Sequence, residues 1–152
     1  MKAKTLKRLM NIWPPFIGAG IRVEEISPDY QYARVAMRLR WYNRNYVNAH
    51  FGGSLYAMTD PFYMLLMMQN LGKKYIVWDQ SGSVEYVKPG KGRVVAEFKI
   101  TEDMIHAAHQ ATQTGEKYLP DYTVRVVDEN DDIVAIIHKK LYIRLKKQYR
   151  NV

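Results

Sequence analysis

A short amphipathic helix is predicted at the start of the chain. Pro14 and Pro15 mark its end, because proline lacks the backbone N–H that continues a helix. One apolar face should dock this helix on the rest of the domain. The residues of that face recur at the i, i+3, i+4 and i+7 spacing of a helix: Leu6, Leu9, Met10 and Trp13.

Alternating apolar and polar residues predict two strands after this helix. From Tyr32 to Arg40, small or apolar side chains alternate with arginines, which is the period of two expected for a strand with one buried face. The segment GIRVEEI, residues 20–26, is predicted to be the preceding strand. The sequence SPDY between them is typical of a turn, so the two strands should be neighbours.

The stretch SLYAMTDPFYMLLMMQNLG, residues 54–72, predicts a buried helix. Its apolar residues lie nearly all round the helix, and Gly72 is a common type of C-terminal stop. Asp60 followed by Pro61 leaves two interpretations of where the helix begins. Asp–Pro is a favoured N-cap and first-turn pair, so the helix could start at Asp60. Alternatively it starts near Gly53 and is kinked between Ala57 and Pro61.

The second half of the chain predicts an α+β arrangement with an antiparallel sheet. A helix is expected from Thr101, a natural N-cap, to Gly115. The turn PGKGR predicts a hairpin of the strands on either side of it, and the turn DENDD predicts a second hairpin, in which Lys139 interrupts an otherwise apolar face. The strands are expected at residues 75–78, 83–87, 94–100, 122–127 and 133–145.

Length and composition indicate one domain over residues 1–152, with an N-terminal helix in 1–15 and a basic tail in 146–152. The 152 residues, 47% of them hydrophobic, can bury one sizeable core. The chain has no cysteine, which excludes disulfides and thiolate chemistry and fits a reducing cytoplasm. No apolar run approaches the roughly 20 residues of a membrane span, so a cytoplasmic location without a transmembrane segment is expected.

The net charge of +8 raises the question of an anionic partner. The excess cations cluster at the two ends of the chain, where basic residues are usually solvated, so no nucleic-acid partner is expected. His106 and His109 share a helix face without an acidic partner, and the GKG of PGKGR lacks the features of a phosphate loop. No metal or other cofactor is therefore expected.

One motif connects the predicted elements to a known family. Asn45 is followed by Phe51, Gly52 and Gly53 at the start of the predicted helix and by Asp60 within it. With this order the chain resembles the hot-dog thioesterase superfamily, whose pattern is an Asn, then HGG, then an Asp on the helix. It is most similar to the branch called domain of unknown function 4442, where FGG, an LY-type pair and DP recur. The resemblance covers residues 21–146.

The resemblance implies a hot-dog fold, in which an antiparallel sheet wraps around a long central helix. It also implies a homodimer, often paired into a homotetramer, that hydrolyses acyl-CoA or another acyl thioester at sites in the dimer interface. A backbone N–H of Gly52 or Gly53 would polarise the thioester carbonyl, because an N–H at a helix start is free to bond an oxyanion. Asp60, contributed across the interface, would activate water or attack directly, and Asn45 would orient the water.

The substrate-binding residues suggested by the resemblance are His50, Phe51, Tyr56 and Ser83. Phe51 stands where the family usually has a histidine, and His50 lies one position earlier, so a ring nitrogen that could bond the substrate is lost. Purely structural roles stay open for the glycine pair and for Asn45, which could cap its own loop. The alternative function is therefore a non-catalytic acyl- or lipid-binding protein of the same fold.

Overall fold

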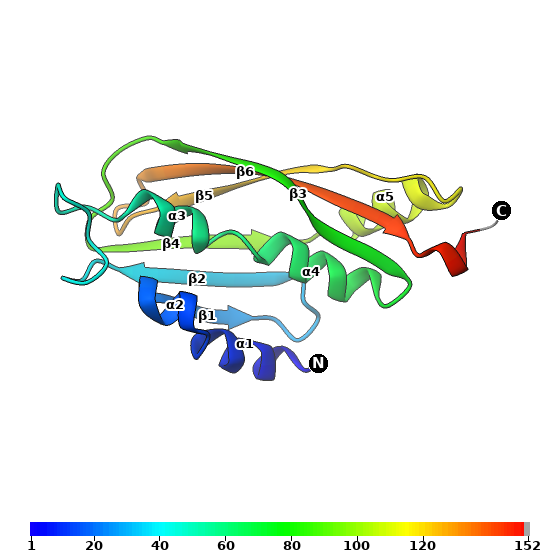
Figure 1. Cartoon of the computed structure of the whole chain (residues 1–152), viewed down its shortest axis with the longest axis horizontal. Helices are drawn as coiled ribbons and strands as arrows, with labels where there is room; N and C mark the ends of the chain where they lie inside the picture. Colours follow the sequence, from blue (N-terminus) through cyan, green and yellow to red (C-terminus); the bar gives the residue numbers. More distant parts are fainter. Residues whose placement is uncertain (151–152) are drawn as a thin grey trace.

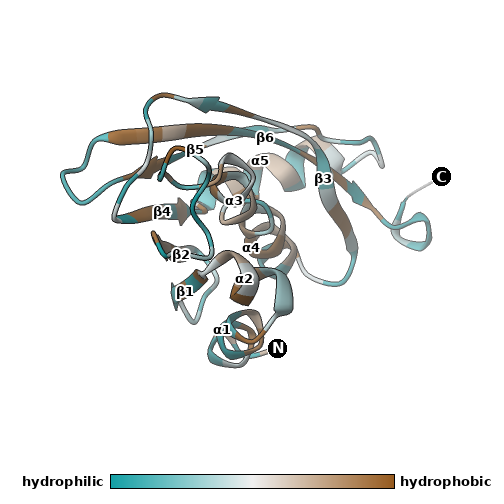
Figure 2. Cartoon of the chain, turned by 60° about the vertical axis from the view of Figure 1, so that its left-hand side comes forward, coloured by the Kyte–Doolittle hydropathy of each residue, from teal (hydrophilic) through white to brown (hydrophobic). Residues whose placement is uncertain are grey.

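Six antiparallel strands form one sheet in the order β1-β2-β4-β5-β6-β3. The computed structural model describes residues 1–150, so the last two residues of the predicted basic tail lie outside the described residues. The sheet curves around helices α3 and α4 (Figures 1 and 2). Its strands are β1 (Ile21–Ile26), β2 (Tyr32–Arg38), β3 (Tyr75–Tyr86), β4 (Arg93–Lys99), β5 (Asp121–Val127) and β6 (Ile133–Leu145).

The helices confirm the predicted α+β class, with a central helical segment against an antiparallel sheet. At α5 the Thr101 hydroxyl accepts a hydrogen bond from the Met104 N–H at 3.3 Å, as an N-cap should. Within residues 1–150 no helix combines the length and apolar character needed to cross a bilayer. The helices are α1 (Ala3–Asn11), α2 (Pro14–Ala19), α3 (Gly52–Ala57), α4 (Phe62–Leu71), α5 (Glu102–Thr112) and the 3₁₀ turn η1 (Lys147–Tyr149).

The prediction of a hairpin around PGKGR is wrong. Strand β3 pairs with β6 at one edge of the sheet, whereas β4 lies between β2 and β5. The two predicted segments 75–78 and 83–87 are also one strand, which continues through a bulge between Asp79 and Ser81. PGKGR does reverse the chain between β3 and β4, but packing across the sheet, and not the nearest turn, sets the partner of each strand.

The proline pair does more than end the first helix. Pro14 and Pro15 are the first two residues of α2, where the missing N–H groups would have no helical acceptor anyway. Both helices pack on β1, and the Asn11 side chain exchanges two hydrogen bonds with the backbone of Val23, at 2.8 and 2.9 Å. The edge of the sheet at β1 is thereby covered.

The core lies between the sheet and the central helices. The Phe62 ring of α4 stacks on Phe98 of β4 with ring centroids 4.9 Å apart. It also packs on Phe16 of α2, with ring centroids 6.2 Å apart. All three phenylalanines are at most 2% exposed. Since these rings join α2, α4 and the sheet, they fix where α4 begins, immediately after Asp60 and Pro61.

Truncation of Phe62 should therefore be severe. We expect Phe62→Ala to lower the free energy of unfolding by about 3–5 kcal/mol, because it leaves a cavity between α4 and the sheet. The matched control is Phe51→Ala, whose ring is 57% exposed and which should change stability by less than about 0.5 kcal/mol. Urea unfolding of both variants measures the difference, and equal losses would contradict this description of the core.

Candidate functional site

The segment that carries the family motif folds as two short helices with a break between them. Helix α3 begins at Gly52 after the extended residue Phe51 and ends at Ala57, and α4 begins at Phe62. The turn between them contains Asp60 and Pro61. The helix breaks here because Pro61 has no N–H to donate to the carbonyl of Ala57. The Asp60 N–H contacts that carbonyl at 3.4 Å. The helical segment thus starts at the glycine pair, as the second interpretation expects, but it is interrupted rather than kinked.

Asp60 does not cap α4. Pro61 occupies the N-cap position, and no side chain bonds the first N–H groups of that helix. The Asp60 carboxylate instead accepts a hydrogen bond from Lys139 on β6, with 2.7 Å between Oδ1 and Nζ. The Asp60 side chain is 50% exposed, whereas that of Lys139 is 1% exposed. Lys139 therefore holds one oxygen of the Asp60 carboxylate from the interior, while the carboxylate as a whole reaches the surface of the chain.

Lys139 is the centre of a buried polar cluster. Its Nζ also forms an ion pair with Asp79 of β3, with 3.0 Å between Nζ and Oδ1. It also donates to the Tyr56 hydroxyl of α3 at 3.3 Å and lies 5.1 Å from the centre of that ring. The cluster thus joins α3, the helix break, β3 and β6 through one ammonium group.

The sequence places Lys139 here by strand parity. It shares the inward face of β6 with Ile137 and Leu141, both fully buried, so its side chain must point toward the helices. An unpaired ammonium in this position would be very costly, and the carboxylates offset that cost. Gly82 lies opposite Lys139 in the strand register, and any Cβ there would collide with the Tyr56 hydroxyl.

The charged groups of the cluster shift one another's pKa values. Burial by itself would lower the pKa of Lys139, but the hydrogen bond from its ammonium to Asp60 and its contact with Asp79 outweigh burial and leave the pKa above its ordinary value. Burial raises the pKa of Asp79, and the neighbouring Asp60 adds to this effect while Lys139 opposes it. Lys139 is therefore a permanent cation beside Asp60 at neutral pH.

The glycine pair has free backbone N–H groups. Within residues 1–150 neither the Gly52 nor the Gly53 N–H has a backbone acceptor, since both stand in the first turn of α3. Gly53 is exposed and Gly52 is half-buried. The Phe51 ring lies against Gly53 and the Tyr86 ring against Gly52, so the two aromatic rings flank this helix start.

The loop before the glycine pair is held by its own polar side chains. Asn45 Oδ1 accepts hydrogen bonds from the N–H groups of Val47 and Ala49, at 3.1 and 3.0 Å. His50 is 3% exposed and its Nε2 donates to the Gly92 carbonyl at 2.9 Å. Burial lowers the pKa of His50, although that hydrogen bond opposes the shift. In one chain both residues thus shape the loop, and their predicted contacts with water or substrate stay predictions.

Ser83 lies apart from this cluster. It is exposed on β3 and stands opposite His138 in the register, one residue from Lys139 on β6. Because successive side chains of a strand point to opposite faces, Ser83 lies on the face away from Lys139 and Asp60. One chain therefore brings together Asp60 and Tyr56 of the predicted residues, adds Lys139 and Asp79, and leaves Ser83 on the other face.

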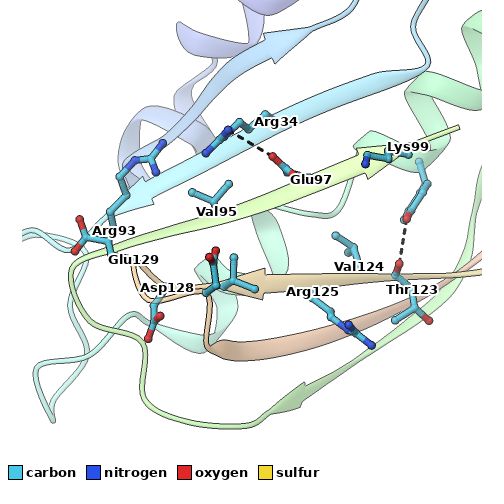
Figure 3. Close-up of a pocket in the computed structure, with 13 residues that line it drawn as sticks. Arg34, Arg93, Val95, Glu97, Lys99, Thr123, Val124, Arg125, Asp128 and Glu129 are labelled. Carbon is cyan, nitrogen blue, oxygen red and sulfur yellow. Dashed lines mark hydrogen bonds and ion pairs between the residues drawn. The ribbon is translucent and has the colours of Figure 1, made fainter.

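A groove of about 660 Å³ on the outer face of the sheet is a separate feature (Figure 3). It lies where β4 and β5 diverge after only two paired positions, and the Tyr63 hydroxyl closes the gap by donating to the Thr123 carbonyl at 3.0 Å. On one side of it, Arg34 of β2 and Glu97 of the neighbouring β4 point toward each other at 3.5 Å. Its charges largely neutralise one another, and none of the motif residues lines it.

With this fold and this helix start, the structure has the hot-dog fold. The chain belongs to the family described as Domain of unknown function (DUF4442), whose model matches residues 2–143. The predicted membership in this branch is confirmed by the family model, and the predicted hot-dog fold is confirmed by the likeness to solved structures. A search of curated proteins found no significant match.

Solved structures of similar shape come from several bacteria. A Pseudomonas aeruginosa protein of unknown function, described as a probable thioesterase, has a TM-score of 0.85 at 17% identity, with 96% of this chain and 97% of that chain covered. A thioesterase from Haemophilus influenzae has a TM-score of 0.69 at 11% identity, with 99% and 96% covered. The PaaI protein of the E. coli phenylacetic acid degradation operon has a TM-score of 0.65 at 14% identity, with 94% of this chain and 92% of that chain covered. At these identities the likeness establishes the fold.

Removal of the buried ammonium should destabilise the fold, because it leaves Asp60 and Asp79 without the cation that pairs with them. We expect Lys139→Met to lower the free energy of unfolding by about 3 kcal/mol, the low end for a broken buried pair because Asp60 is half exposed. Lys140→Met is the matched control, since Lys140 pairs with the 71% exposed Asp121 on the surface, and it should cost less than about 0.5 kcal/mol. Combining Lys139→Met with Asp79→Asn should recover part of the loss. Urea unfolding that shows no difference between the two lysine variants would contradict the cluster's structural role.

Proposed function

We propose that this protein is a thioesterase that hydrolyses an acyl-CoA or a related acyl thioester, and that its active sites form between two copies of the chain. The observation that carries the proposal is the half-exposed Asp60 carboxylate held by the buried Lys139 at a helix break. Two of the similar structures are described as a probable thioesterase and a thioesterase. Their descriptions support the reaction class, and the residues of this chain supply the mechanism.

Asp60 would be the base or the nucleophile. Its Oδ1 is bonded to Lys139, and within the described part of the chain no hydrogen bond to Oδ2 is found. In the general-base route Oδ2 takes a proton from water, and the resulting hydroxide adds to the thioester carbonyl carbon. In the nucleophilic route Oδ2 itself adds to that carbon, and water then hydrolyses the anhydride. In both routes the C–S bond breaks and the leaving thiolate takes up a proton.

The N–H groups of Gly52 and Gly53 would stabilise the oxyanion of the tetrahedral intermediate. Helix α3 has six residues, so its dipole is small, and the two free N–H donors would supply most of the stabilisation. The absence of a side chain on Gly53, the exposed member of the pair, lets a thioester approach the backbone closely. The rings of Phe51 and Tyr86 beside the pair would exclude water from the approaching carbonyl.

One chain cannot supply both groups to the same carbonyl. Gly53 and Asp60 are seven residues apart, and a helix rises about 1.5 Å per residue, so about 10 Å separates them along the helical segment. A donor and a base that act on one carbonyl must each lie within about 3 Å of it. We therefore place the Asp60 of one copy opposite the glycine pair of another.

The free edge of the sheet supports pairing of two copies. Strand β3 has 12 residues, and within residues 1–150 it bonds β6 on one side and no strand on the other. A long unpaired edge is a ready surface for a second chain. The opposite edge, at β1, is covered by α1, so β3 is the edge at which a second copy would pair.

The acyl chain would lie along α4. Met64, Leu65 and Met68 form a half-buried apolar stripe that continues from Pro61, while Met58 and Met67 on the other faces are fully buried in the core. Methionine side chains are flexible and polarisable, and so they accommodate acyl groups of varied shape. The stripe begins beside Asp60, where the thioester carbonyl would be held.

The test is thiol release from a panel of short-chain, long-chain and aryl acyl-CoA esters. We expect wild type to release thiol from at least one of them and Asp60→Asn to lower kcat/KM by at least about 100-fold, because the amide cannot act as base or nucleophile. Asp121→Asn is the matched control. Asp121 is a 71% exposed strand residue paired with Lys140, and its replacement should leave kcat/KM close to that of wild type.

The outcomes separate the two functions that the fold suggests. Release by wild type and by Asp60→Asn at equal rates would contradict the role of Asp60. If wild type releases no thiol from any ester yet binds them, the non-catalytic acyl-binding alternative is correct instead.

A further inference from the structure

Four large apolar side chains lie exposed at the junction of α1 and α2. We call them the α1–α2 patch. Leu9 and Trp13 are each 47% exposed, so the prediction that they dock the first helix on the domain is wrong, and only Met10 of that predicted face is buried. Ile17 is 56% exposed and Ile12 is 66% exposed. Leu9, Ile12 and Trp13 line one apolar hollow with Met10 and Pro14. Exposed apolar surface of this kind marks an interaction site on a folded protein.

The patch is held in a fixed arrangement. The Trp13 ring packs on Phe16 with ring centroids 5.1 Å apart, and Phe16, which is 2% exposed, contacts Phe62 in the core. The hydrogen bonds between Asn11 and Val23 hold the end of α1 on β1. Because the Trp13 ring and the end of α1 are already held, a partner would bind them at little further cost in entropy.

Basic residues dominate the part of α1 that leads to the patch. Residues 1–23 contain five lysines and arginines and no acid, while Glu25 of β1 lies beside Lys4 and Lys7. Lys4 and Arg8 are exposed on α1, and their helical row leads to Ile12 four residues on, while the neighbouring row leads from Thr5 through Leu9 to Trp13. Cations therefore occupy the first half of the exposed face of α1, and apolar side chains occupy its end.

We propose that the α1–α2 patch docks the protein on the surface of an anionic lipid bilayer. Aliphatic side chains and a tryptophan would enter the boundary between headgroups and acyl chains, and Lys4 and Arg8 would contact the anionic headgroups. Tryptophan favours this boundary because its ring is apolar with one polar N–H. Three of the four patch residues are aliphatic, and they offer no stacking surface for nucleic-acid bases, so lipid is favoured over nucleic acid.

The position of the patch is compatible with a dimer. Helices α1 and α2 pack on β1, which is at the opposite end of the strand order from the free edge of β3 (Figure 1). Two chains paired through β3 would each keep the patch uncovered. This inference does not depend on thioester hydrolysis, and bilayer binding can be measured whether or not the protein is an enzyme.

The test is co-sedimentation of the full chain with vesicles. We expect binding to vesicles of equal parts phosphatidylcholine and phosphatidylglycerol and much weaker binding to phosphatidylcholine alone. In a Trp41→Phe/Trp78→Phe background the emission of Trp13 should shift to shorter wavelength on binding. Lys4→Gln/Arg8→Gln should weaken binding to the anionic vesicles about tenfold or more, since each cation near an anionic surface contributes to the attraction.

The variants distinguish the patch from the rest of the basic chain. Ile12→Ser/Ile17→Ser should abolish binding, whereas the control Val47→Ser/Val87→Ser, with matched exposures of 65% and 55%, should bind like wild type. Circular dichroism verifies that each variant is folded. The proposal would be overturned if Lys4→Gln/Arg8→Gln and Ile12→Ser/Ile17→Ser both bound the anionic vesicles like wild type. Absence of vesicle binding together with a change of oligomeric state in Ile12→Ser/Ile17→Ser would also overturn it, and would assign the patch to a contact between copies.

Discussion

A single buried ammonium group organises the site of this protein. Lys139 is 1% exposed, and its position on the inward face of β6 forces carboxylates from other elements to meet it. Asp79 does so from the neighbouring strand, and Asp60 does so from the break between α3 and α4. Because Pro61 frees Asp60 from the helical ladder, the same residue that interrupts the helix also lets the carboxylate turn toward the ammonium.

The geometry of the helix break links the fold to the proposed reaction. The free N–H groups of Gly52 and Gly53 and the carboxylate of Asp60 stand at opposite ends of a short helical segment, about 10 Å apart. In the proposed reaction, each chain would therefore carry two halves of a site that closes only between two copies. Within residues 1–150 the edge of β3 pairs with no strand on one side, and we propose that two copies join there, whereas α1 and α2 cover the other edge and expose apolar side chains.

Elements with strong local signals could be predicted from the sequence. Thr101 caps α5, and the turn DENDD joins β5 to β6, because capping and hairpin turns depend on neighbouring residues. The pairing of β3 with β6 could not be predicted, since it depends on packing across the whole sheet. The partner of Asp60 was missed for the same reason, because Lys139 lies 79 residues away and appears in the sequence only as a charge that interrupts an apolar strand face.

Thiol release by mixed dimers tests the shared site most directly. One chain carries Asp60→Asn, and the other carries Gly52→Pro/Gly53→Pro, which removes both donors yet starts the helix as Pro14 and Pro15 start α2. Gly52→Ala/Gly53→Ala, which keeps both N–H groups, is the control for the added side chains. Each proline or asparagine variant alone should be inactive, and an equal mixture should regain about a quarter of wild-type activity, since half the dimers hold one intact site. A mixture that forms mixed dimers yet stays inactive would contradict a site built from two chains.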